Sequence, residues 1–275
     1  SVSGITSIGK MALMANTTGN LNSAFGFQAL RNNADGYWNT ATGYQSLYRN
    51  TAGYGNTANG TGAMYNNLSG QNNTGVGYRS LYTTTSGTGN AALGSASMYS
   101  NSTGSYNTAI GNNALRGNQI GTSNVAIGVR ALYLGTNRSN LVAIGDSALY
   151  NNANGLGVPG GKIPIPEGYY NTAIGSKAMY ANVSGYNCTA VGYQAMRLSL
   201  GSDNTAVGAN SLSTNTTGAQ NSAMGLYALY SNTTGNGNTG FGSNALYGTT
   251  GNGEYNTAMG YSAGSTLTTA RYNTG

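Results

Sequence analysis

The sequence predicts an all-β parallel β-solenoid, or β-roll, of about 15 coils with a 17-residue repeat. A glycine recurs about every 17 residues, Leu or Met follows four residues after 14 of these 15 glycines, and Asn/Thr/Gly-rich clusters stand between the repeats. A period this short leaves no room for a helical hairpin, so each repeat is expected to be one coil that buries its apolar face against its neighbours. The recurring glycines are Gly9, Gly26, Gly43, Gly60, Gly77, Gly94, Gly111, Gly128, Gly145, Gly175, Gly192, Gly208, Gly225, Gly242 and Gly260.

The residues before each glycine predict a short strand. Asn stands four residues earlier in 12 of 15 repeats, Thr or Ser usually comes next, then a small residue, and usually an apolar one. This alternation is typical of a strand, and copies paired in parallel would lie about 4.8 Å apart, so the array would be on the order of 70 Å long. The predicted asparagine ladder is Asn22, Asn39, Asn56, Asn73, Asn90, Asn107, Asn124, Asn171, Asn204, Asn221, Asn238 and Asn256.

The residues after each glycine predict the core. An Ala-Leu-Tyr pattern recurs there, which we interpret as a second short extended segment before a turn that requires positive φ. Each buried Leu or Met would stabilise the coil by about 1.5–3 kcal/mol. The predicted core ladder is Leu13, Leu30, Leu47, Met64, Leu81, Met98, Leu115, Leu132, Leu149, Met179, Met196, Leu212, Leu229 and Leu246.

One insertion interrupts the period. Residues 1–155 and 171–275 are predicted to form one continuous array, with a Pro/Gly-rich inserted loop over residues 156–170. Proline donates no ladder hydrogen bond, so this loop is expected to leave the solenoid, either as a contact site or as a neutral insertion. The candidate contact residues are Pro159, Lys162, Pro164, Pro166, Glu167, Tyr169 and Tyr170.

The residue two positions before each glycine is always Ala, Ser or Gly, which indicates close packing. It packs against either the opposite wall of a narrow coil or a neighbouring chain. Only one face of each strand can point into its own coil, so the second face is expected to be covered as well. We therefore predict lateral association of the chain with itself, in its simplest form a homotrimer of parallel solenoids.

Composition argues against several functions. The chain has no histidine, five scattered acidic residues and no run of Lys or Arg despite a net charge of +6. These features exclude His-dependent catalysis and His-ligated metal sites and disfavour a two-carboxylate glycosidase. We therefore expect no enzyme activity, no cofactor, no nucleic-acid partner and no membrane insertion.

Three residue types have more than one interpretation. Cys188 takes the asparagine position of its repeat, which indicates a ladder substitution rather than a nucleophile. The recurring tyrosines indicate an exposed or interface ladder, with a sugar-binding platform as the alternative. Asn-x-Ser/Thr sequons recur at one turn position, where they are either glycosylation sites or simply residues that favour the turn. Their asparagines are Asn16, Asn67, Asn101, Asn182, Asn215 and Asn232.

Units such as Asn107–Gly111 followed by Ala114 and Leu115 resemble the head repeats of trimeric autotransporter adhesins. The segment Asn39–Tyr48 is more similar still to repeats of phage- and virus-type tail-fibre proteins. The first resemblance implies a left-handed parallel β-roll trimer. The second implies a virion or cell-surface fibre, in a class of proteins that often end in a self-cleaving chaperone domain of the endosialidase type.

The sequence thus predicts a non-enzymatic extracellular or virion-surface rod that acts as a spacer or adhesin, with a cell-surface glycan or receptor as its partner. One alternative is an extracellular filament subunit that stacks end to end through uncapped coils. A second is an ice-binding solenoid, based on the row of Thr beside Ile or Val. A carbohydrate-degrading tailspike is the enzyme alternative, and the scarcity of acidic residues disfavours it.

Overall fold

Short parallel strands and turns make up the chain. The computed structural model describes residues 3–135, 137–152, 168–251 and 253–275. The chain divides into two compact units, Ser1–Arg138 and Ser139–Gly275. No helix occurs among the described residues, and each coil contributes one three-residue strand. The predicted all-β parallel β-solenoid of about 15 coils with a 17-residue period is therefore confirmed.

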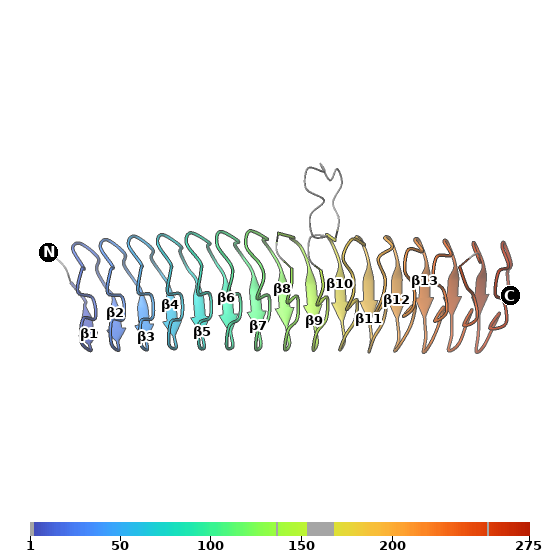
Figure 1. Cartoon of the computed structure of the whole chain (residues 1–275), viewed down its shortest axis with the longest axis horizontal. Helices are drawn as coiled ribbons and strands as arrows, with labels where there is room; N and C mark the ends of the chain where they lie inside the picture. The colour runs from blue at the N-terminus through green and yellow to red at the C-terminus, as the bar shows by residue number, and fades with distance from the viewer. Residues whose placement is uncertain (1–2, 136, 153–167, 252) are drawn as a thin grey trace. The chain divides into compact units, whose positions relative to one another are not determined.

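The first unit stacks its strands in chain order, each paired in parallel with the next (Figure 1). The register is in phase with the repeat, so that Thr6 pairs with Ser23, and Ala109 with Ala126. Each residue type therefore lies directly beside its copy in the next coil. The strands are β1 (Thr6–Ile8), β2 (Ser23–Phe25), β3 (Thr40–Thr42), β4 (Thr57–Asn59), β5 (Thr74–Val76), β6 (Ala91–Leu93), β7 (Thr108–Ile110) and β8 (Val125–Ile127).

The second unit has the same construction. Its strands are β9 (Val142–Ile144), β10 (Thr172–Ile174), β11 (Thr189–Val191), β12 (Thr205–Val207), β13 (Ser222–Met224), β14 (Thr239–Phe241) and β15 (Thr257–Met259). Val142 pairs with Thr172 and Ile144 with Ile174, so the insertion between these strands leaves their register unchanged. Of the candidate contact loop, Pro159, Lys162, Pro164, Pro166 and Glu167 lie outside the described residues.

The prediction of a second extended segment at Ala-Leu-Tyr is wrong. Turns occupy this stretch in every complete coil, and the backbone at Gln28 and Leu30 has φ of 58° and 49°. A 17-residue coil with one short strand must reverse its direction tightly, which the left-handed region of φ provides. Leucine rarely adopts this conformation. Here the turn stays tied to the next coil, because the Leu30 N–H donates to the Ser46 carbonyl at 3.0 Å.

A narrow apolar interior forms the core of each unit. All fourteen residues of the predicted core ladder are buried, together with the Ala that precedes most of them. The small residue at the centre of each strand points into the same interior. A Cβ at Gly75 would lie 3.0 Å from Met64 Cγ and 3.0 Å from Ser80 Oγ, so a larger side chain does not fit. The opposite wall of a narrow coil, and not a neighbouring chain, therefore explains the small residue.

Candidate functional site

A ladder of buried asparagines runs beside the strands. In the first unit, the Asn39 backbone N–H donates to Asn22 Oδ1 of the preceding coil at 3.0 Å, and Asn39 Nδ2 donates to the carbonyl of Gly53, 14 residues further along the chain, at 2.8 Å. The same two bonds recur from coil to coil, and all twelve predicted ladder asparagines are buried. Each amide therefore satisfies polar groups that the narrow core would otherwise leave without partners.

A second buried asparagine ladder follows the turns, at the position that the sequence identifies only as sequons. Asn50 Nδ2 donates to the Gly53 carbonyl of its own turn at 3.0 Å and to Asn33 Oδ1 of the preceding coil at 2.6 Å. Asn33, Asn50 and Asn118 are buried at this position although none belongs to a sequon. Their recurrence at one repeat position is the sequence signal that identifies this ladder.

Five of the six sequon asparagines are buried in the folded chain, which favours turn chemistry over glycosylation at these positions. These asparagines are fully buried, and the Nδ2 atom that would carry a glycan donates instead to a turn carbonyl, as in Asn182 to Gly185 at 3.0 Å. Asn16 is half-buried, and its Nδ2 makes the same bond to Gly19 at 2.9 Å. The buried five are Asn67, Asn101, Asn182, Asn215 and Asn232.

Tyrosines of neighbouring coils stack face to face. In the first unit, the rings of Tyr48, Tyr65, Tyr82 and Tyr99 form a continuous column with centroid separations of 4.9, 5.2 and 5.1 Å. Burial raises the pKa of the Tyr65 hydroxyl, and the flanking tyrosines raise it further. Within the column the ring faces are covered by each other, so only edges and hydroxyls meet solvent. This geometry argues against a stacking platform for sugars there.

Arginines flank this tyrosine column. Arg31 lies 5.6 Å from the Tyr48 ring centroid, and its Nη1 donates to the Tyr48 hydroxyl at 2.7 Å. At the other end, Arg116 lies 5.1 Å from the Tyr99 centroid. Cation–π contacts of this length stabilise the pair by about 0.5–1 kcal/mol when exposed. The column thus has a guanidinium group at each end.

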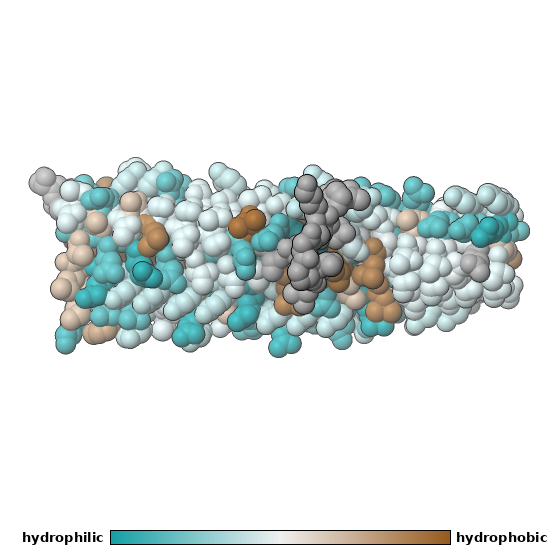
Figure 2. All heavy atoms as spheres, turned by 45° about the horizontal axis from the view of Figure 1, so that its top comes forward, coloured by the Kyte–Doolittle hydropathy of each residue, from teal (hydrophilic) through white to brown (hydrophobic). Residues whose placement is uncertain are grey.

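Each strand has an outward face with two rows. Thr or Ser supplies most of the first row, and apolar side chains such as Leu93 and Ile110, about 40% exposed, supply most of the second. Neither row contains a charged residue. Ala91, Val125 and Val142 interrupt the hydroxyl row. On the face shown in Figure 2, strongly apolar residues lie in small separate groups among polar and weakly hydrophilic ones.

Cys188 continues the strand-side ladder of the second unit. Its backbone N–H donates to Asn171 Oδ1 at 3.0 Å, and its Sγ lies 3.3 Å from the Gly201 carbonyl, near the place of an asparagine amide. Burial raises the pKa of the thiol to about 11. The thiolate is the nucleophilic form of cysteine, so this side chain is unreactive at neutral pH.

Tyr169 and Tyr170 are the described members of the candidate contact loop. Their ring centroids lie 6.3 Å apart with planes tilted by 46°, and Tyr170 is exposed. The two rings do not form a flat double platform, because they are not coplanar. What the described residues of this loop offer is therefore one exposed ring, on Tyr170.

The described residues contain no group of three or more acidic, Cys or His side chains placed to hold a metal ion. None of the described segments forms a helix long and apolar enough to span a membrane. No protein-family model matches the chain, and no curated protein sequence is significantly similar to it. The candidate functional surfaces are thus the outward strand rows and the arginine-flanked tyrosine column.

Proposed function

We propose that this protein is a non-enzymatic structural fibre segment that acts as a rigid spacer or adhesin outside the cell or on a virion. The proposal rests on one observation: the repeated residues connect each coil to its neighbours. In each unit the same positions form the strand pairs, two asparagine ladders and the apolar column, and all of them join one coil to the next. Such repetition serves length and stiffness, whereas a catalytic site needs a few unlike residues at one place.

Removal of one whole coil tests the spacer proposal. Deleting residues 57–73 joins Asn56 to Thr74 and restores the Asn-Thr sequence of the junction that it removes. Because stability in an array is a sum over repeats and their interfaces, the melting temperature should fall by only a few degrees. Circular dichroism during heating measures it.

Deletion of residues 57–65 is the matched control, since it removes about half a period. Every ladder after the junction then faces the wrong neighbour, and we expect the cooperative transition to be lost. Equal damage by both deletions would contradict the modular spacer, because it would mean that the array depends on one irreplaceable coil.

Lateral self-association completes the proposed fibre. Parallel sheets in proteins are normally covered on both faces, and the outward face here has an uncharged row of apolar side chains. A second and third copy of the chain are the occupants that suit a face repeated on coil after coil. The interruptions of the hydroxyl row by Ala91 and Val125 favour this occupant over a regular ice lattice.

Charge introduced into the apolar row should dissociate the assembly. In the double variant L93K/I110K, two lysines replace side chains that are 41% and 40% exposed. Buried interfaces tolerate unpaired charge poorly, so light scattering should report the mass of one chain where the native protein gives three. The variant L68K/I120K adds the same charge at exposed turn residues and should remain trimeric. A native mass of one chain would refute the trimer directly.

A further inference from the structure

The net positive charge of the chain comes from its first unit. Residues 1–138 have seven basic side chains and one acidic one, Asp35, whereas residues 139–275 have four of each. The first unit therefore has a net charge of +6 and the second a net charge of zero. The seven basic residues are Lys10, Arg31, Arg49, Arg79, Arg116, Arg130 and Arg138.

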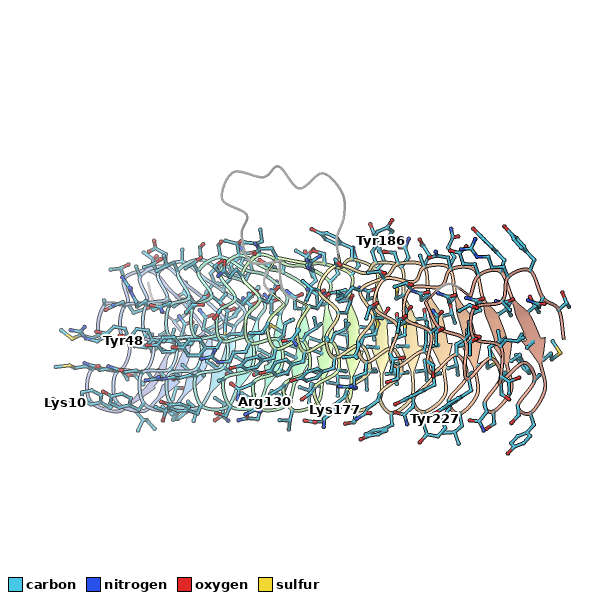
Figure 3. All side chains as sticks on the ribbon, turned by 45° about the vertical axis from the view of Figure 1, so that its right-hand side comes forward. Lys10, Tyr48, Arg130, Lys177, Tyr186 and Tyr227 are labelled. Carbon is cyan, nitrogen blue, oxygen red and sulfur yellow. The ribbon has the colours of Figure 1, made fainter. Side chains whose placement is uncertain are left out.

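Four of these arginines gather on the tyrosine column. Arg31 and Arg116 lie at its two ends, as described above. Arg79 lies 5.3 Å from the Tyr82 centroid. Arg49 Nη1 contacts Asn66 Oδ1 at 3.4 Å, and its charge lowers the pKa of the Tyr65 hydroxyl, against the larger effect of burial. The four arginines together with Tyr48, Tyr65, Tyr82 and Tyr99 are named the arginine–tyrosine stripe (Figure 3, where Tyr48 is labelled).

No carboxylate among the described residues forms an ion pair with an arginine of the stripe. The ion pair found in that part of the chain joins Arg271 to Glu254 at 3.6 Å, in the second unit. Arg49 and Arg79 are exposed, and Arg31 and Arg116 are half-buried. The Tyr hydroxyls and the side-chain amide of Asn66 lie on the same coils and are groups that can bond to uncharged hydroxyls. The stripe thus combines guanidinium groups that have no described carboxylate partner with neutral polar groups.

The spacing of the arginines indicates what the stripe binds. They belong to the coils of Gly26, Gly43, Gly77 and Gly111, at steps of one, two and two coils. With coils about 4.8 Å apart, the cations follow one another at about 5–10 Å along the axis. One coil is comparable in length to one sugar ring. We propose that the stripe binds a linear acidic polysaccharide with one carboxylate or sulfate for every one or two sugars.

Charge density and ring geometry favour this ligand over nucleic acid. Duplex DNA has one charge per about 1.7 Å of its axis, far denser than the stripe. Single strands bind by stacking bases on open aromatic faces, and the faces inside this column cover each other. The proposal is independent of the fibre function, since a binding stripe needs only the first unit to be folded.

Binding of alginate, a linear uronate polymer, to the full chain tests the proposal. We expect saturable binding that weakens steeply as sodium chloride rises from about 50 to 500 mM, because salt screens exposed charges. Neutral dextran of the same length should not bind. The double variant R79Q/R116Q should lower the affinity about tenfold, since it removes two charge-assisted contacts.

The second unit provides a matched control. Lys177 and Arg197 stand two and five residues after their glycines, the same repeat positions as Arg79 and Arg116, so K177Q/R197Q removes the same charge at equivalent places. Its alginate affinity should match that of the native chain.

Equal losses of affinity in both variants would show that the stripe is not the binding site. An absence of alginate binding would show that the proposed class of ligand is wrong. Tighter binding of single-stranded DNA than of alginate, with loss in R79Q/R116Q, would assign the stripe to nucleic acid instead. Unchanged melting temperatures confirm that each variant is folded.

Discussion

Replacement of Gly94 by Ala should destabilise the first unit by about 4 kcal/mol. Gly94 has φ of 135°, in a region that L-residues rarely adopt, and a Cβ there would lie 2.5 Å from the Gly111 carbonyl oxygen of the next coil. The clash is with backbone that is itself bonded into the array, so no side chain can move aside. Urea unfolding followed by circular dichroism should show a lower midpoint for G94A.

Gly62 is the matched control for Gly94. It also has positive φ, 63°, but its Cβ would find the nearest atom at 3.5 Å, the ordinary contact distance. Gln28 and Gln45 occupy the same repeat position in earlier coils with φ of 58° and 54°. The variant G62Q should therefore unfold within about 1 kcal/mol of the native chain. If G94A were as stable as G62Q, close contact between successive coils would not explain the recurring glycine.

Replacement of Asn73 by Ala should cost about 3 kcal/mol, because it leaves several buried polar groups without a partner. The side chain of Asn73 accepts the Asn90 backbone N–H at 2.9 Å and donates to the Gly87 carbonyl at 2.7 Å. Both bonds are inside the unit, where water cannot replace them. Hydrogen exchange gives the most specific readout, since the Asn90 amide should lose protection in N73A.

The neighbouring Asn72 is the control for Asn73. It is exposed and has φ of 54°, so glycine is accommodated there without strain. We expect N72G to change the free energy of unfolding by less than about 1 kcal/mol and to leave the exchange of Asn90 unaffected. Similar losses in N72G and N73A would mean that loss of asparagine from this segment, rather than the ladder bonds, determines the effect.

The period alone predicts the strands and the apolar column, because residues in phase must lie beside their copies. A Leu at the same place in successive coils, such as Leu30 and Leu47, can hardly be anywhere but inside. The period does not predict the backbone conformation of that Leu. Apolar alternation cannot distinguish a strand from a turn in which Leu30 adopts φ of 49°, so the sequence wrongly predicts an extended Ala-Leu-Tyr segment.

The turn asparagines show the limit of short motifs. Asn67-Leu-Ser matches a sequon, yet Asn50 has the same buried role with no sequon at all. A three-residue motif describes neighbours along the chain, whereas the ladder joins residues 17 positions apart. The arginine–tyrosine stripe was missed for a related reason. Its charges are scattered in sequence and gather only when coils are stacked.

The tyrosines show how packing narrows the choice of function. Sequence permits either a ladder or a sugar platform, since both use recurring aromatic rings. Stacking at about 5 Å covers the faces of Tyr65 and Tyr82 and leaves their edges exposed. The column then positions cations, and the binding that we propose uses hydroxyls and guanidinium groups rather than ring faces.

Negative-stain electron microscopy of the purified chain, paired with its mass by light scattering, tests the fibre proposal most directly. We expect discrete elongated particles on the order of 70 Å long, from fifteen coils at about 4.8 Å each, with the mass of three chains. Continuous filaments would favour the end-to-end polymer. Compact particles with the mass of a single chain would contradict both the fibre and its lateral association.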